Sequence, residues 1–231
     1  MKAVEEKSVL RWGGLAGILA GIFFFLTIVI AATTLLLDAG AEGPVIRFPD
    51  VRAALTVVEG LYLVGLILYV TLFLALYQAL RGTSLAPALG SVVGVMGLTM
   101  FAVGSLVYVA LAHVSGLYYA PGATSEEQAT LVLIWESIQG VFSSTDSVGL
   151  LLVPIGVIVL GKAMHEVPAF GKRFGRVTVV LGAVGVIGMT LLVVDPLSPT
   201  ALVGIFVGAF VAIVIFPLLL GWKVYSLSRA P

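Results

Sequence analysis

The sequence predicts an all-α integral membrane protein, and its composition leads to this fold class. Apolar residues make up 60% of the 231 residues, whereas charged residues make up only 10%. A soluble domain carries about 25% charged residues, so this chain has too few polar side chains to cover a water-facing surface. The absence of cysteine excludes disulfides and cysteine-ligated metals, and the net charge of zero offers no basic surface to nucleic acid. The expected partner of most of the surface is the lipid bilayer.

Six apolar segments are long enough to cross a membrane, because a spanning helix needs about 20 apolar residues. The first is longer than the roughly 7–15 apolar residues of a secretory signal, so we interpret it as a retained span. The polar connections are too short for another domain, and residues 1–231 are therefore predicted to form a single six-helix domain. The spans are expected at about 13–37, 54–80, 89–112, 131–160, 177–194 and 201–222.

The basic residues indicate the orientation of this bundle. Ten of the 12 lysines and arginines fall on one side of the predicted spans, and only Arg47 and Arg52 fall on the other. The positive-inside rule therefore predicts a multi-pass protein of the inner (plasma) membrane with both termini in the cytoplasm. The ten residues are Lys2, Lys7, Arg11, Arg81, Lys162, Lys172, Arg173, Arg176, Lys223 and Arg229.

Local signals predict where two of the helices begin. Residues 125–128 (SEEQ) match a capping box with acidic residues in the first turn, so the fourth helix is expected to begin at Ser125. Pro49 and Asp50 precede the second helix in the same manner. The fourth helix would be about 55 Å long against a hydrocarbon core of about 30 Å, so we expect it to tilt, project or break at Gly140 or Pro154.

Two connections on the basic side resemble each other and suggest a tandem helical-hairpin repeat. The motif PALG at 87–90 lies 81 positions before PAFG at 168–171, and Arg81 lies the same distance before Lys162. The odd-numbered helices are also rich in glycine, which lets helix backbones approach closely. We interpret these glycines as packing within the bundle, with docking of a homo-oligomer or a membrane partner protein on the same faces as the alternative. They are Gly13, Gly17, Gly21, Gly90, Gly94, Gly97, Gly104, Gly182, Gly185 and Gly188.

The fourth span carries polar residues in the segment WESIQGVFSSTDSVG, which runs from 135 to 149. At about 100° per residue, five of them fall within a sector of about 80–100°, so they form one stripe. An ionised carboxylate in mid-membrane costs about 2.5–3.5 kcal/mol, and such residues face the bundle interior or water. The stripe consists of Glu136, Gln139, Ser143, Asp146 and Ser147, with Asp146 expected in the outer half of the membrane.

Polar residues of two other helices are expected at the same depth. Glu59 lies about two turns inside the second helix, Tyr62 shares its face, and His113 ends the third span. Together with the stripe they predict an outward-facing pocket that binds a ligand. The alternatives are that Glu59 and Glu136 are interfacial acids, and that His113 is an ordinary interface histidine.

No cofactor, metal site or catalytic residue is predicted. The two histidines, His113 and His165, fall on opposite sides of the membrane, and no second histidine completes a zinc motif after His165. The sequence has no Gly-x-Ser-x-Gly motif, and no lysine occurs in the middle of a span.

Two segments, LALYQALRGTSLAPALG at 74–90 and IVLGKAMHEVPAFGKRFG at 158–175, carry a family resemblance. The chain, over about residues 10–195, resembles small six-span bacterial and archaeal membrane proteins classed as a domain of unknown function. The resemblance implies the six-helix fold and implies no activity or site residues.

Three functions are compatible with these features. The first is binding or transport of a small cation, a proton, or a cationic or lipid-like ligand in the outward-facing pocket. The second is an accessory or structural subunit that packs against partner membrane proteins. The third is a membrane-embedded enzyme that modifies lipid, for which the sequence supplies no evident nucleophile.

Overall fold

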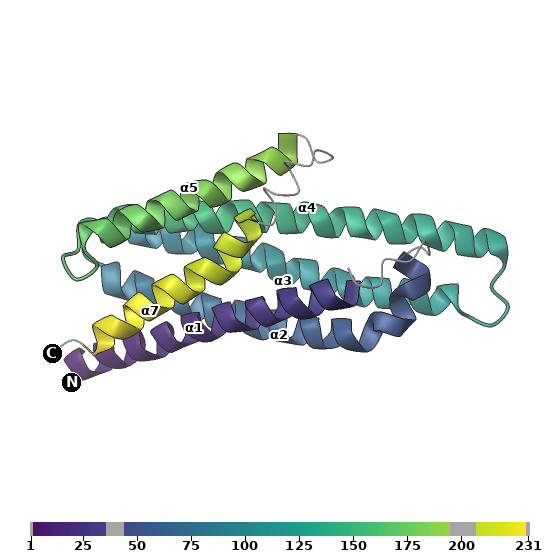
Figure 1. Cartoon of the computed structure of the whole chain (residues 1–231), viewed down its shortest axis with the longest axis horizontal. Coiled ribbons are helices and arrows are strands. Elements are labelled where there is room, and N and C mark those ends of the chain that lie inside the picture. Colours follow the sequence, from purple (N-terminus) through teal and green to yellow (C-terminus); the bar gives the residue numbers. More distant parts are fainter. Residues whose placement is uncertain (1, 36–43, 195–206, 230–231) are drawn as a thin grey trace.

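The chain folds into long helices that run along a common direction (Figure 1). The computed structural model describes residues 2–35, 44–194 and 207–229, and these contain no strand. Six of the described helices are long and apolar enough to cross a membrane, so the predicted fold class is confirmed. The sixth, Val207–Ser228, is called the last helix and contains two of the elements given below, a π-helical segment and α7. The elements are α1 (Lys2–Leu35), α2 (Pro44–Leu80), α3 (Ala86–Tyr118), α4 (Ser125–Met164), α5 (Lys172–Val194), the π-helical segment η1 (Phe210–Ile215) and α7 (Phe216–Ser228).

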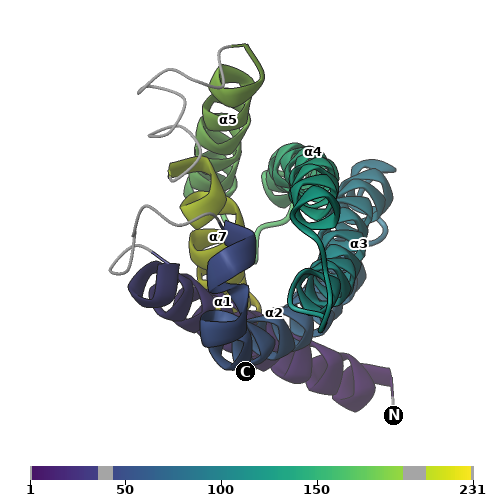
Figure 2. The ribbon, with the colours of Figure 1, turned by 90° about the vertical axis from the view of Figure 1, so that its right-hand side faces the viewer.

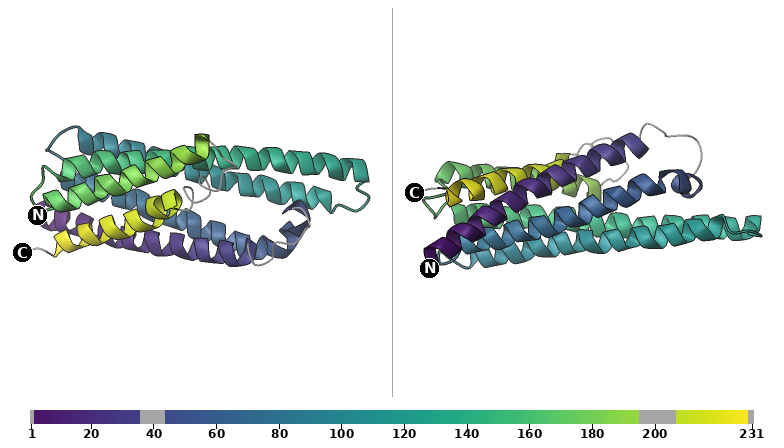
Figure 3. Two further views of the ribbon diagram at one scale, coloured as in Figure 1. Left: turned by 45° about the horizontal axis from the view of Figure 1, so that its top comes forward. Right: turned by 90° about the horizontal axis from the view of Figure 1, so that it is seen from below.

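The helices form an incomplete ring when the bundle is viewed along its axis (Figure 2). Helix α1 packs between α2 and α7, α3 packs on α2 and α4, and α5 packs on α4. Both termini lie at one end of the bundle, which we call the terminal end, and the α3–α4 turn lies at the far end (Figures 1 and 3). The assignment of the terminal end to the cytoplasm remains a prediction.

Glycines at intervals of seven residues bring α3 and α4 into close contact. A Cβ built on Gly97 would lie 3.0 Å from the carbonyl oxygen of Gly149, and one built on Gly90 would lie 2.9 Å from that of Gly156. Only glycine permits backbones this close, and a seven-residue spacing keeps the contact on one face of each helix. The antiparallel register of α3 against α4 is therefore fixed along their length.

Glycines also join α1 to α7. A Cβ on Gly17 would lie 2.9 Å from the Cα of Gly221, and one on Gly221 would lie 2.8 Å from the carbonyl oxygen of Gly14. In α5, a Cβ on Gly185 would meet the ring of Pro154 at 2.9 Å. Contacts within the chain thus account for these glycine-rich faces, and docking of a partner on them stays a separate hypothesis.

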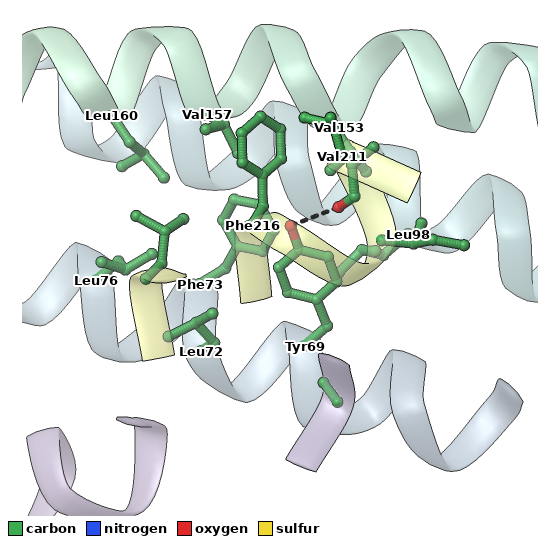
Figure 4. Packing of buried hydrophobic residues seen from close by; sticks show 14 of the residues in the cluster. Tyr69, Leu72, Phe73, Leu76, Leu98, Val153, Val157, Leu160, Val211 and Phe216 are labelled. Carbon is green, nitrogen blue, oxygen red and sulfur yellow. Dashed lines mark hydrogen bonds between the residues drawn. The ribbon is translucent and has the colours of Figure 1, made fainter. Parts of the chain in front are cut away.

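The central core lies on the terminal side of mid-bundle, between α2, α4 and the last helix (Figure 4). Phe73, Val153, Val157, Leu160 and Phe216 are each 0% exposed. Water is excluded from this layer, because the side chains interdigitate at the density of a protein interior.

One predicted capping box and one predicted helix start need correction. The capping box of α4 is Thr124 with Glu127, one residue earlier than predicted: the Glu127 carboxylate accepts from the Thr124 N–H at 2.8 Å, and the Thr124 hydroxyl accepts from the Glu127 N–H at 3.3 Å. Helix α4 begins at Ser125, as predicted. The Gln128 side chain, which was expected in the capping box, donates to the carbonyl of Tyr118. Helix α2 begins at Pro44 and includes Pro49, because Phe48 is packed against α3 and α4.

Helix α4 is continuous from Ser125 to Met164, so the break, one of the three alternatives considered for its length, does not occur. Pro154 fits inside the helix with its ring under Gly185 of α5, and Gly140 has no atom of another element within 4 Å of a built Cβ. The α3–α4 hairpin instead extends beyond the described parts of the other helices at the far end (Figures 1 and 3).

The two connections of the predicted tandem repeat adopt different conformations. Residues 87–90 lie in the first turns of α3, whereas residues 168–171 lie in the turn before α5 and end at Gly171 with φ of +79°. The repeat therefore stays a prediction from sequence.

Candidate functional site

Two acidic side chains, Glu59 of α2 and Asp146 of α4, lie close enough inside the bundle for their charges to repel each other. One oxygen of each carboxyl group, Glu59 Oε2 and Asp146 Oδ1, is buried and has no hydrogen-bond partner among the described residues. A buried polar group without a partner costs about 1–3 kcal/mol, and more if it is charged. Two such groups side by side in a membrane span are an energetic cost that packing alone does not explain.

The close packing of α3 on α4 determines where Asp146 points. Gly90, Gly97 and Gly104 follow one another along α3 at intervals of seven residues. Asp146 lies opposite the last of them, Gly104. A Cβ built on Gly104 would lie 2.9 Å from Asp146 Oδ1, so the carboxyl group occupies the space that a larger residue would fill. The acid is thus held against the α3 backbone and away from the lipid.

A hydroxyl and a phenol complete the polar group. The side chain of Ser105, next to Gly104, forms a hydrogen bond with Glu59, and its 3.5 Å contact to its own helix carbonyl at Phe101 is long. The phenol of Tyr62 lies within the electric field of both acids. Its ring packs edge-on against Phe24 of α1 at 5.5 Å and Phe101 of α3 at 6.2 Å between centroids.

The spanning parts of the surrounding helices supply no cationic side chain, since residues 53–80, 86–112 and 131–161 contain no lysine, arginine or histidine. On α2 the nearest cation to the pair is Arg52, which is exposed and lies about 10 Å from Glu59 along the helix, toward the far end. The negative charge of the pair is therefore not neutralised by a residue of these spans. In the described chain no group of three or more histidine, aspartate or glutamate side chains forms a metal cluster.

The polar stripe continues from Asp146 toward the far end. Gln139 is half-buried, while Ser143 and Glu136 are exposed. At about 100° per residue, these three lie within about 80° of Asp146 around α4. The stripe thus leads from the exposed side chains to the acid pair along one face of one helix.

The structure brings together only part of the predicted set. Glu59, Tyr62 and Asp146 form the site, with Gln139 and Ser143 beside it. The predicted residue Glu136 is exposed about 15 Å farther along α4. His113 is also exposed, and its position nine residues beyond Gly104 directs it to about the opposite side of α3.

Sequence reasoning assigned Gly104 to helix packing and did not place it at the site, and it missed Ser105. The seven-residue glycine spacing that ends at Gly104 is visible in the sequence, and it would have identified the α3 face that meets α4. Sequence reasoning also missed an aromatic cluster on the far-end side of the pair, where Phe48 contacts Tyr108 at 5.6 Å and Trp135 at 5.2 Å between ring centroids.

Four of the five hydroxyl side chains in residues 135–149 donate to the backbone of their own helix. Ser144 donates to the carbonyl of Gly140 at 2.9 Å and Ser147 donates to that of Ser143 at 2.7 Å. An enzyme of the kind considered from the sequence needs one of these serines beside a base. Donation to the α4 backbone does not support that role for Ser144 or Ser147.

Comparison of the chain with family models, curated proteins and solved structures gives no match in any of the three. The six apolar helices define the class as a multi-pass membrane protein. A more specific function has to be argued from the acid pair itself.

Proposed function

We propose that the protein binds a proton or a small monovalent cation between Glu59 and Asp146, and that it carries this cation across the membrane. The observation that supports the proposal is the pair of buried carboxyl oxygens without hydrogen-bond partners, contributed by two different helices. Other oxygens at the same place are the Ser105 hydroxyl and the Tyr62 phenol.

The charge of the site favours a positively charged occupant. Two ionised carboxylates in a region of low dielectric repel each other strongly, and both are penalised by burial. A proton or a cation placed between them removes the repulsion and supplies the missing partner of both oxygens. Oxygen ligands suit hard cations, and neutral ligands have no comparable reason to bind here.

Access from the far end would follow the stripe on α4. Glu136, Gln139 and Ser143 precede Asp146 on this face at intervals of about one turn, and Glu136 and Ser143 are exposed. Polar residues in a span line ion and proton pathways, because the alternative is to expose them to lipid. We therefore propose that water reaches Asp146 along this face.

Cation-dependent stability tests the binding step. A ligand that binds only the folded state stabilises it by about 2.7 kcal/mol at a concentration of 100 times its dissociation constant. We expect the unfolding temperature of the purified protein to rise with added Na⁺, K⁺ or Li⁺, or with falling pH if the ligand is a proton. Asp146→Asn should abolish this dependence, whereas Glu126→Gln, an acid-to-amide change at an exposed residue of the same helix, should preserve it.

Thiol labelling tests the access route, because the chain contains no cysteine of its own. Ser143→Cys on the stripe should react with a membrane-impermeant maleimide in intact membranes. Val141→Cys is the matched control, since it is 60% exposed on another face of α4 at nearly the same depth. Equal protection of both cysteines would contradict a water-filled route to the acid pair.

Transport is measured separately in proteoliposomes with a pH-sensitive or cation-sensitive dye inside. A flux that disappears in Asp146→Asn and persists in Glu126→Gln supports carriage of the cation. Stabilisation without flux would limit the function to binding.

A further inference from the structure

The last helix of the bundle, Val207–Ser228, changes its helical geometry near the beginning of its described part. Residues Phe210–Ile215 form the π-helical segment η1, and α7 continues from Phe216. The wider turn is seen in the hydrogen bonding, because the Phe216 N–H donates to the carbonyl of Val211, five residues earlier, rather than to residue 212. Segments of this kind are uncommon and occur frequently at functional sites.

Pro217 leaves the carbonyl of Ala212 without a partner in its own helix. In the π register this carbonyl would accept from residue 217, and proline has no N–H. The Tyr69 hydroxyl of α2 donates to it instead at 3.0 Å, in a place where Tyr69 and Ala212 are both 0% exposed (Figure 4). A side chain from another helix thus replaces the missing backbone bond.

We propose that η1 is a hinge in the last helix and that the Tyr69 hydroxyl is the latch that holds it closed. The half of the helix after the hinge is fixed, because α7 is joined to α1 through the close approach of Gly17 and Gly221. Before the hinge the structure describes residues 207–209, which approach α5: a Cβ on Gly208 would lie 3.3 Å from the carbonyl oxygen of Gly185. Motion at η1 changes the position of residues 207–209 relative to α7, which stays in place.

The hinge lies next to the layer that closes the terminal side of the acid pair. Tyr69 and Tyr62 both pack on Phe24, and Tyr69 is about 10 Å nearer the terminal end along α2. Val211 of η1 and Phe216 of α7 fill the space between α2 and α4 at this level (Figure 4). Opening of the hinge would move Val211 out of this layer while Phe216 stays with α7. That an occupant of the acid pair is then released rests on the proposed function.

Distances between spin labels test the hinge without any ligand. The first pair of cysteines, Val29→Cys on α1 and Val207→Cys before η1, measures the distance from α1 to the residues that the hinge moves. Both positions are more than 40% exposed. A control pair, Leu19→Cys and Trp222→Cys, spans the fixed contact between α1 and α7 at exposed positions. Pulsed electron paramagnetic resonance then measures the distance distribution of each pair in nanodiscs.

We expect one narrow population for both pairs in the otherwise unchanged protein. Tyr69→Phe should add a second population to the moving pair and leave the control pair unchanged. Pro217→Ala restores a backbone donor, so in that background Tyr69→Phe should no longer change the moving pair. This dependence on Pro217 separates a latch from a general loss of packing.

Three results would overturn the proposal. They are an unchanged moving pair in Tyr69→Phe, equal broadening of both pairs, and the same effect of Tyr69→Phe with and without Pro217. If Pro217→Ala does not fold, the first two results still decide. A failure of cation binding leaves these label distances unaffected, so the two proposals fail separately.

Discussion

Replacing Asp146 by asparagine should stabilise the protein in the absence of a ligand. In the wild-type protein, Asp146 Oδ1 is buried without a donor and lies in the field of Glu59. The asparagine side chain keeps the shape, removes one negative charge and adds two N–H donors. An asparagine N–H that faces Glu59 Oε2 would give this oxygen the donor it lacks. An unpartnered buried polar group costs about 1–3 kcal/mol, so we expect the free energy of unfolding at neutral pH to rise by about this amount.

The measurement is reversible unfolding in mixed micelles at neutral and acidic pH, without added alkali cation. The gain from Asp146→Asn should shrink as the pH falls, because protonation of the wild-type pair removes the same repulsion. Glu126→Gln provides the control, since loss of an exposed acid from the first turn of a helix costs no more than about 1 kcal/mol.

A variant that is less stable than the wild type at both pH values would refute this reasoning. Such a result means that Asp146 stabilises the folded protein through satisfied interactions, as a structural acid does. The proposed cation site would then lose its main support.

Three further predictions concern single contacts. Gly104→Ala should weaken cation-dependent stabilisation at least tenfold, because the added methyl group would lie 2.9 Å from Asp146 Oδ1. In Gly97→Ala the methyl group would lie 2.9 Å from the Val153 amide nitrogen, so this variant should lose about 1–3 kcal/mol of stability and retain its affinity. Titration of thermal unfolding with the ligand distinguishes the two results. Tyr69→Phe should cost about 1–3 kcal/mol in chemical unfolding, because the buried Ala212 carbonyl loses its donor. Thr124→Ala removes the capping box and should cost about 0.5–2 kcal/mol, measured as faster amide exchange in the first turn of α4.

The number and identity of the spans were predictable because lipid demands long apolar helices. The ends of the helices were not. The start of α2 depends on Phe48, whose burial against Tyr108 and Trp135 is a contact between distant segments. The continuity of α4 through Pro154 depends on α5, which covers the proline where the hydrogen bonding of the helix is interrupted.

The site was partly predictable because helical periodicity relates residues within one helix. It placed Gln139, Ser143 and Asp146 on one face of α4, and depth in the membrane placed Glu59 near the same level. Periodicity gives no rotation of one helix relative to another, and for this reason His113 was expected at the site although it lies on another side of α3. The missing information is the register of α3 against α4.

The packing that sets this register also separates the closely packed pair α3 and α4 from the proposed hinge at η1. Backbone contacts at Gly90, Gly97 and their partners on α4 leave no room for sliding, so Asp146 keeps its place beside Gly104. The last helix contacts the same core through a wider turn and one side-chain hydrogen bond from Tyr69. The proposed carriage of a cation needs a fixed binding group and a barrier that opens, and we assign these two requirements to different helices. Substitutions beside the acid pair, such as Gly104→Ala, should therefore change affinity, whereas substitutions around η1 should change the rate of release.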